Sequence, residues 1–328
     1  MPDPLLITSE DFDALEPEWL DLWRNVPDAT PFHHPAWHRV WLRHFGESVA
    51  PVFLGLRRGA ELVGVAALQM ERTEARELGD HNVRDYAGPL VLPGEEVAAS
   101  SGILEWLRED LTPAATFWGL PNDSPMRFAL LQIPEATGWQ AEESPEALCP
   151  RADLPGDFES FVASLPKHDR HELRRKMRNF EAAGETASAS FTAPGEVSAG
   201  MDTLFELMRR SRDDKADFLT PAMEAFFRDL AATFAELSLV RLSQLTLDGQ
   251  PAGMTLSFDD GQTSYLYNSG FEPDQRALAV GLVSKAYAIR EAIELGRKRF
   301  DFLRGDEEYK RRLGAIDRQL VTVRLTDV

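Results

Sequence analysis

A phosphate-binding pattern occurs at Arg276-Ala-Leu-Ala279-Val-Gly281, where a long apolar helix pattern starts. Small residues at a helix start let backbone N–H groups approach a phosphate, and the helix dipole favours the anion. The guanidinium of Arg276 adds a charge-assisted contact. The alternative is an ordinary strand–loop–helix joint whose small residues pack against a sheet.

Two acidic residues near the C-terminus are candidate catalytic groups. Asp301 alternates with Phe300 and Phe302, so its side chain points away from their face, toward the end of a strand. A carboxylate there could accept a proton from an amine or anchor a substrate, or it could pair with Arg304. Asp306 is a candidate catalytic group and equally a candidate helix N-cap.

Composition excludes several classes of protein. The chain has 328 residues, of which 43% are hydrophobic and 27% charged, as in ordinary globular proteins. No apolar run is long enough to span a bilayer, and acidic residues near the start argue against a secretory signal. The single cysteine, Cys149, excludes an internal disulfide and a CxxC site. We therefore expect a cytoplasmic location.

The charge of the chain is unevenly distributed. The net charge is −19, which argues against DNA as a partner. Residues 1–150 contain 10 arginines, no lysine and 25 acidic residues, a net charge of −15, whereas residues 151–328 carry −4. An anionic ligand is therefore expected in the second half. Because Pro, Glu and Ala dominate residues 134–155, we place the domain linker there, between domains 1–150 and 151–328.

Apolar periodicity predicts the elements that would hold these residues. In the first half we expect helices at 9–25 (with Ser9 as N-cap), from Pro35 and at 95–110, a hairpin at 51–56 and 61–69, an apolar segment at 86–92 and a strand at 116–120. In the second half we expect helices at 157–165, 167–183, 201–212, 221–237, 277–295 and 307–313, and strands at 186–192, 239–247, 252–258, 263–267, 299–303 and 316–325.

The order hairpin, strand, long helix, strand occurs in both halves. The segment Leu56–Gly64 corresponds to Leu247–Gly253, and the strand at 116–120 corresponds to that at 299–303. Matching order and spacing favour two copies of one fold, although hairpins and helices are common enough to match by chance. The first copy has no counterpart of Arg276 and has two acidic residues, Glu95 and Glu96, where a phosphate would bind. It is therefore interpreted as structural or substrate-shaping.

The segment at 276–281 resembles the pyrophosphate loop of the GNAT superfamily of acyl-CoA-dependent acyltransferases, Gln/Arg-x-x-Gly-x-Gly/Ala. Ala279 stands in place of the first glycine. The segment Phe300–Lys310 and the basic segment 167–183 resemble a bacterial acetyltransferase-like branch associated with cellulose biosynthesis and related to Fem-type transferases. Over residues 1–150 the resemblance is general, at Phe32-His-His-Pro-Ala-Trp37 and the following hairpin.

The resemblance implies an α/β (mixed α+β) fold with two tandem GNAT-like domains, each a mixed, mostly antiparallel sheet flanked by helices. It implies acetyl-CoA or another acyl-CoA as co-substrate, an amine acceptor on a small molecule or cell-surface precursor, and Tyr309 as the acid that protonates the leaving thiolate. The implied cofactor-binding residues are Tyr267, Asn268, Ser269, Arg276, Ala277, Leu278, Ala279, Val280 and Gly281. Tyr265, Arg304 and Lys215 are the candidate substrate contacts. A packed aromatic role for Tyr309 remains an alternative.

Residues 167–178 form a basic segment, with six Lys or Arg and two acidic residues. This segment could contact a polyanion, or it could be a solvated face paired with nearby acids. It motivates a second hypothesis, Fem-type transfer from aminoacyl-tRNA, which the net charge opposes. A third hypothesis is a catalytically silent binding module. No metal is expected, because the histidines at 34 and 38 lack a third ligand and those at 168 and 171 have basic neighbours.

Overall fold

The computed structural model describes residues 3–110, 112–132, 137–211 and 213–327, which divide by their contacts into two compact units. Unit 1 comprises residues 1–148 and 318–328, and unit 2 comprises residues 149–317. The C-terminal segment that we assigned to the second domain therefore lies in unit 1. Within the described residues, no helix is both long and apolar enough to cross a membrane.

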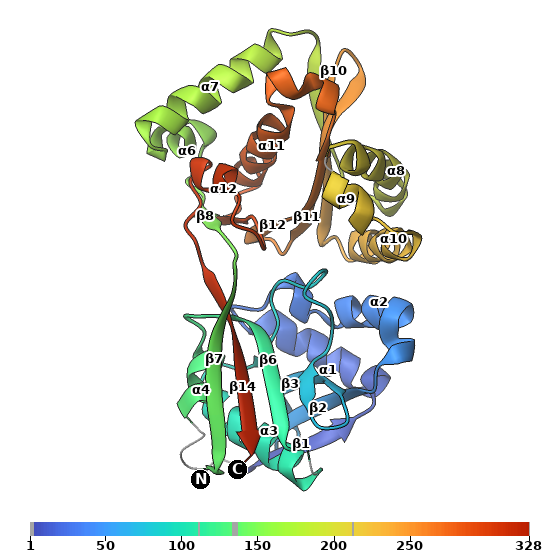
Figure 1. Cartoon of the computed structure of the whole chain (residues 1–328), viewed down its shortest axis with the longest axis vertical. Helices are drawn as coiled ribbons and strands as arrows, with labels where there is room; N and C mark the ends of the chain where they lie inside the picture. Colours follow the sequence, from blue (N-terminus) through green and yellow to red (C-terminus); the bar gives the residue numbers. More distant parts are fainter. Residues whose placement is uncertain (1–2, 111, 133–136, 212, 328) are drawn as a thin grey trace. The chain divides into compact units, whose positions relative to one another are not determined.

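Unit 1 is built on one sheet with helices on both faces (Figure 1). Its strands are β1 (Leu5–Glu10), β2 (Pro51–Arg58), β3 (Glu61–Met70), β4 (Ala75–Glu77), β5 (Leu90–Val91), β6 (Ala114–Pro121), β7 (Trp139–Leu148) and β14 (Gln319–Asp327). Its helices are α1 (Phe12–Asn25), η1 (Pro31–His33), α2 (Pro35–Phe45), η2 (Gly46–Ser48), α3 (Glu96–Glu109) and α4 (Pro125–Gln132).

Unit 2 has a second sheet of the same kind. Its strands are β8 (Arg151–Asp153), β9 (Thr186–Phe191), β10 (Val240–Leu247), β11 (Gln250–Asp259), β12 (Thr263–Phe271) and β13 (Arg299–Asp301). Its helices are α6 (Phe158–Ser164), α7 (Lys167–Glu181), α8 (Pro194–Ser211), α9 (Asp213–Phe218), α10 (Pro221–Glu236), η3 (Pro273–Leu278), α11 (Val280–Glu294) and α12 (Glu308–Arg312).

The two sheets repeat the same strand order and directions. The order β1-β2-β3-β4-β6-β14 in unit 1 corresponds to β9-β10-β11-β12-β13-β8 in unit 2. All neighbours in both series are antiparallel except β4–β6 and β12–β13, which are parallel. In each unit a long helix, α3 or α11, connects to the second strand of the parallel pair. This agreement supports the duplication inferred from the sequence.

The strand next to β6 in unit 1 and the strand next to β13 in unit 2 come from different places in the chain. In unit 1, β14 from the C-terminus lies between β6 and β7, antiparallel to both (Figure 1). In unit 2, the equivalent place beside β13 is taken by β8, which precedes the rest of that unit. The boundary between the units, at 148/149, lies inside the predicted linker at 134–155. The described part of that segment is not a plain linker, however, because it contains β7 and β8; residues 134–136 lie outside the described residues.

Several predicted boundaries change for local reasons. The first helix begins at Phe12, because the carboxylate of Asp11 caps it by accepting from the amides of Asp13 and Ala14, and Ser9 belongs to β1. As predicted, Pro35 opens α2, where a ring nitrogen of His34 accepts from the Ala36 amide. The helix predicted at 201–212 begins earlier, at Pro194, and Arg212 lies outside the described residues. The short helix α9 was not predicted.

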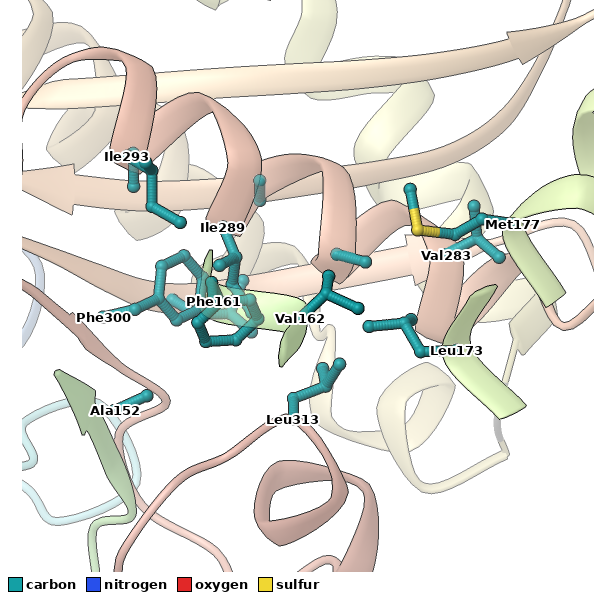
Figure 2. Packing of buried hydrophobic residues seen from close by; sticks show 14 of the residues in the cluster. Ala152, Phe161, Val162, Leu173, Met177, Val283, Ile289, Ile293, Phe300 and Leu313 are labelled. Carbon is teal, nitrogen blue, oxygen red and sulfur yellow. The ribbon is translucent and has the colours of Figure 1, made fainter. Parts of the chain in front are cut away.

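The core of unit 2 lies between the sheet and α6, α7 and α11 (Figure 2). Val283 and Ile289 of α11 face Leu173 and Met177 of α7 and the aromatic ring of Phe161 in α6. The opposite face of the sheet is covered by α8 and α10 (Figure 1). Burial on both faces fixes α11 against β11 and β12, and it therefore fixes where α11 begins relative to the strand ends.

Candidate functional site

The strand β12 loses its partner on one side partway along its length. It pairs with β13 only from Thr263 to Tyr265, whereas its pairing with β11 continues to Phe271. The register with β11 also shifts, because Leu256 faces Asn268 and Ser257 faces Leu266, so that Tyr267 is an extra residue in a bulge. Backbone groups beyond Tyr265 on the β13 side are thus outside the ladder between these two strands.

The two ends of β12 have different surroundings. Near its start, the hydroxyl of the buried Tyr265 donates to Asp260 (2.9 Å), and burial is the main cause that raises its pKa well above the usual value. Near its end, the ammonium of Lys215 donates to the carbonyl oxygen of Ser269. Of the predicted substrate contacts, Lys215 is therefore joined to the predicted cofactor strand, whereas the Tyr265 hydroxyl is held at the β11–β12 turn.

The predicted helix at 277–295 is interrupted at Ala279. This residue has φ 56° and ψ 35°, in the left-handed region, and it separates η3 from α11. The interruption turns the chain so that α11 begins at Val280. A Cβ atom on Gly281 would lie 2.9 Å from the ring of Phe271, so the close approach of β12 to this helix start requires a glycine.

The start of α11 has the donors that an anion needs. The amides of Leu282 and Val283 both donate to the carbonyl of Ala279. The amides of Val280 and Gly281 come before these first hydrogen bonds of the helix, so they have no acceptor within α11. Arg276 in η3 is exposed and makes no ion pair with any residue that the structure describes. The neighbouring Ala277 is exposed and Leu278 packs partly against the core. These residues fit a phosphate-bearing ligand.

The start of the equivalent helix in unit 1 is closed to anions. Glu95, the N-cap residue of α3, forms an ion pair with Arg58 (2.7 Å), and the Glu96 carboxylate accepts from the amide of Gly94 (2.8 Å). Two carboxylates at the positive end of a helix stabilise it and repel a phosphate. If one of the two units binds a phosphate in this way, the geometry favours unit 2.

The loop after β13 is held in a strained conformation. Leu303 has φ 55°, and the carboxylate of the buried Asp301 accepts a hydrogen bond from its amide (2.8 Å). The buried ammonium of Lys310 donates to the carbonyls of Leu303, Arg304 and Gly305 at 2.8–3.1 Å. Asp301 thus has a structural partner within its own loop. The expectation that Asp306 caps the next helix is wrong, because Glu307 is its N-cap residue and the Asp306 side chain is exposed.

Tyr309 is connected to the start of α11 through a residue that the sequence analysis missed. The ammonium of Lys285, 7% exposed, lies 5.0 Å from the centre of the Tyr309 ring and donates to the carbonyl of Gly281 (2.8 Å). The ring of Tyr309 also meets that of Phe302 edge-on, with centroids 6.2 Å apart. The signal for Lys285 was available: it is a lone charge among small and apolar residues, four positions after Gly281.

Comparison with known proteins identifies the fold. Residues 167–311 match the sequence profile of the acetyltransferase (GNAT) domain. No curated protein matches the chain. Solved structures do: FemX (TM-score 0.68, 12% identity, 96% of each chain covered), a conserved protein of unknown function from Bacteroides thetaiotaomicron (0.62, 12%, 98% of this chain and 99% of that one) and a tandem GNAT protein from the clavulanic acid biosynthesis pathway (0.52, 15%, 97% and 98%).

These likenesses extend over nearly the whole chain at low identity, so they concern the fold. The protein has a mixed α/β fold with two tandem GNAT-like domains, as expected from the sequence. The site described above lies within residues 167–311, the part of the chain that matches the GNAT-domain profile.

Proposed function

We propose that the protein is an acyl-CoA-dependent N-acyltransferase, with acetyl-CoA as the expected donor and unit 2 as the donor-binding unit. The observation that carries the proposal is the exposed Arg276 of η3, just before the start of α11, together with the stretch of β12 beyond Tyr265 that does not pair with β13. The match of residues 167–311 to the GNAT domain supports it. The finer resemblance to the branch associated with cellulose biosynthesis remains a prediction.

In this proposal the chemistry is the transfer of an acyl group from sulfur to nitrogen. The amine nitrogen, after losing a proton, forms a bond to the thioester carbon; the C–S bond then breaks and the thiolate takes up a proton. Backbone amides of β12 beyond Tyr265 are suited to bind the carbonyl oxygen as negative charge develops on it. The hydroxyl of Tyr309 is the proposed proton donor to the thiolate.

Other predicted residues have supporting roles in the proposal. Arg276 and the first amides of α11 bind the pyrophosphate, while Tyr267, Asn268 and Ser269 contact the rest of the donor. The hydrogen bond from the Leu303 amide favours Asp301 as a positioning residue that shapes the loop before α12. Lys285 takes a similar role, because it joins Tyr309 to Gly281.

Calorimetric titration with acetyl-CoA tests the proposal. We expect saturable binding that weakens at least tenfold in Arg276→Ala, because a charge-assisted contact to a phosphate is lost. Arg299→Ala is the matched control, since Arg299 is also an exposed arginine of unit 2. Arg299 lies opposite the first residue of β12, whereas Arg276 follows the end of that strand. Absence of binding at high micromolar concentrations, or equal affinity in Arg276→Ala and the wild type, would contradict it.

A second candidate is transfer from aminoacyl-tRNA, and one observation favours it. On α7, Lys167, His171 and Arg178 are exposed along one side of the helix, although Arg174 and Arg175 pair with acids. A gel shift with bulk tRNA at physiological salt tests this candidate. A shift that disappears in the triple variant Lys167→Ala, His171→Ala, Arg178→Ala would favour it, and no shift would remove it. If neither donor binds, a silent binding module remains.

A further inference from the structure

A cavity of about 220 Å³ lies within unit 1. Its wall includes Leu90 and Val91 of β5, the end of β6 and the starts of α3 and α4. In unit 2 the proposed site lies at the start of α11, the helix that connects β12 to its parallel partner β13. In unit 1 the cavity lies at the start of α3, the helix before β6, which is the parallel partner of β4. It is the topological counterpart in unit 1 of the site that we propose for acyl-CoA in unit 2.

The cavity has one largely buried cation. Arg318, whose side chain is 17% exposed, lines it and pairs with one carboxylate oxygen of Asp123, through Nε at 3.1 Å and Nη2 at 2.9 Å. The ring of Tyr86 lies 5.8 Å from the guanidinium carbon and holds it against the wall. The side chain of Asp123 is 61% exposed, so its carboxylate is also hydrated. A guanidinium has five N–H donors, more than Asp123 uses.

Two acidic residues, Glu96 and Asp28, also line the cavity. Glu96 is half-buried and Asp28 is exposed at the rim. His33, another lining residue, is neutral near pH 7, because burial and the charge of Arg84 lower its pKa to about 3. The remaining wall is mostly apolar, with Val91, Leu120 and Met126 among its members. The cavity therefore offers one cation, two anions and an apolar surface.

This combination selects the class of ligand. A nucleotide is disfavoured, because the carboxylate of Glu96 takes the place of a phosphate at the start of α3 and the cavity is small. A simple carboxylate leaves the two acids unmatched, and a simple amine leaves Arg318 unmatched. Burial of an apolar side chain adds binding energy in proportion to its area.

We propose that this cavity binds a small zwitterion with an apolar side chain, the chemistry of a free α-amino acid. The ligand's carboxylate binds the guanidinium of Arg318, its ammonium faces Glu96 and Asp28, and its side chain packs against Met126 and Leu120. The site is complete within unit 1. It does not depend on acyl-CoA binding by unit 2, so the two proposals can fail separately.

Methyl NMR of the full chain labelled at its methionines tests the proposal, because Met126 lines the cavity. L-Leucine is the probe, and each matched compound lacks one charge: 4-methylpentanoate has no ammonium and 3-methylbutan-1-amine has no carboxylate. We expect leucine to shift the Met126 signal saturably and each matched compound to bind at least tenfold more weakly. Absence of a Met126 shift, or equal affinity for the three compounds, would overturn the proposal.

Two variants locate the site. Arg318→Met removes the cation and keeps an apolar stem, and it should weaken leucine binding at least tenfold. Arg324→Met is its control, because Arg324 is an exposed arginine on the following strand, β14. Arg318→Met also breaks the pair with Asp123, so Val26→Phe, which enlarges a side chain that lines the cavity and keeps every charge, is the second variant. Unchanged leucine affinity in either variant, with a folded chain by thermal melting, would contradict the proposal. Calorimetric titration of the same variants with acetyl-CoA reports separately on unit 2.

Discussion

The ammonium of Lys285 lies 5.0 Å from the centre of the Tyr309 ring, so a buried charge of α11 rests against the aromatic residue of α12. The same ammonium donates to the carbonyl of Gly281 in the first turn of α11. The proposed proton donor and the proposed phosphate site are thereby joined through one side chain.

Replacing Lys285 by methionine should reduce turnover by at least threefold. Methionine fills a similar volume, so the core of unit 2 should keep its packing, but the cation over the Tyr309 ring is lost. Steady-state kinetics with acetyl-CoA and an amine panel measure the effect, and a thermal melt monitors folding. Lys285→Arg keeps the charge and should retain more activity than Lys285→Met. Equal activity in wild type and Lys285→Met would show that this contact does not orient Tyr309.

Tyr309→Phe should lower turnover and leave acetyl-CoA affinity nearly unchanged. The hydroxyl would matter in the transition state, where general acid catalysis contributes about 10²–10⁴-fold, and little in the ground state. Because the ring is kept, its contacts with Phe302 and Lys285 should survive. Comparison of turnover with calorimetric affinity separates the two effects. Full activity in this variant would leave Tyr309 as a packing residue.

Asp301→Asn distinguishes a base from a positioning residue. The asparagine oxygen can still accept from the Leu303 amide, so a positioning role predicts less than a tenfold loss of turnover. A general base would lose its function, with a loss of about 10²-fold or more. The pH profile of turnover provides the second measurement, since loss of a base removes the acidic limb. A large loss of turnover together with a missing acidic limb in the pH profile would show that Asp301 acts as a general base.

Ala279→Gly should stabilise the protein slightly or leave its stability unchanged. A left-handed conformation costs a residue with a side chain about 1–2 kcal/mol, and the extra backbone entropy of glycine offsets part of that gain. Ala288→Gly in the middle of α11 is the matched control, and there the same change should destabilise by about 1 kcal/mol or more. Urea denaturation measures both. A larger loss at position 279 than at 288 would contradict the conformational argument.

The buried pair of Glu77 and Arg84 should make stability depend on pH. Their closest charged atoms are 3.7 Å apart, both side chains are 1% exposed, and burial raises the pKa of Glu77 to about 7 against an opposing effect of Arg84. The folded state thus binds more protons than the unfolded state between about pH 4.5 and 7, so the contribution of Glu77 to stability decreases as pH rises through that range. The full effect is about 3 kcal/mol.

The variant Glu77→Gln isolates this contribution. Buried histidines change stability in the opposite direction, since burial is the main cause that lowers the pKa of His33 to about 3 and that of His38 well below its usual value. These histidines are present in both proteins, so their contribution cancels in the difference in unfolding free energy between wild type and Glu77→Gln. Urea denaturation of wild type and variant from pH 4.5 to 8 should show the wild type losing stability relative to Glu77→Gln. A constant difference across that range would show that Glu77 does not titrate there.

The local elements and their order can be predicted from the amino-acid sequence. The caps, turns and apolar periods that define α2, both hairpins and most helices depend on residues close together in the chain, such as His34-Pro35 and Asp248-Gly249. The repeated order of these elements, together with the resemblance of 276–281, was enough to predict two tandem domains of one fold.

Strand pairing and contacts between distant side chains could not be predicted in this way. A strand's neighbours depend on distant segments, so nothing local showed that β14 returns to unit 1 or that β7 forms within a proline-rich stretch. The break at Ala279 and the close approach of Gly281 to Phe271 are likewise features that helix periodicity does not contain. Lys285 acquired its partner in the same way, since the Tyr309 ring reaches it only when α12 packs beside α11.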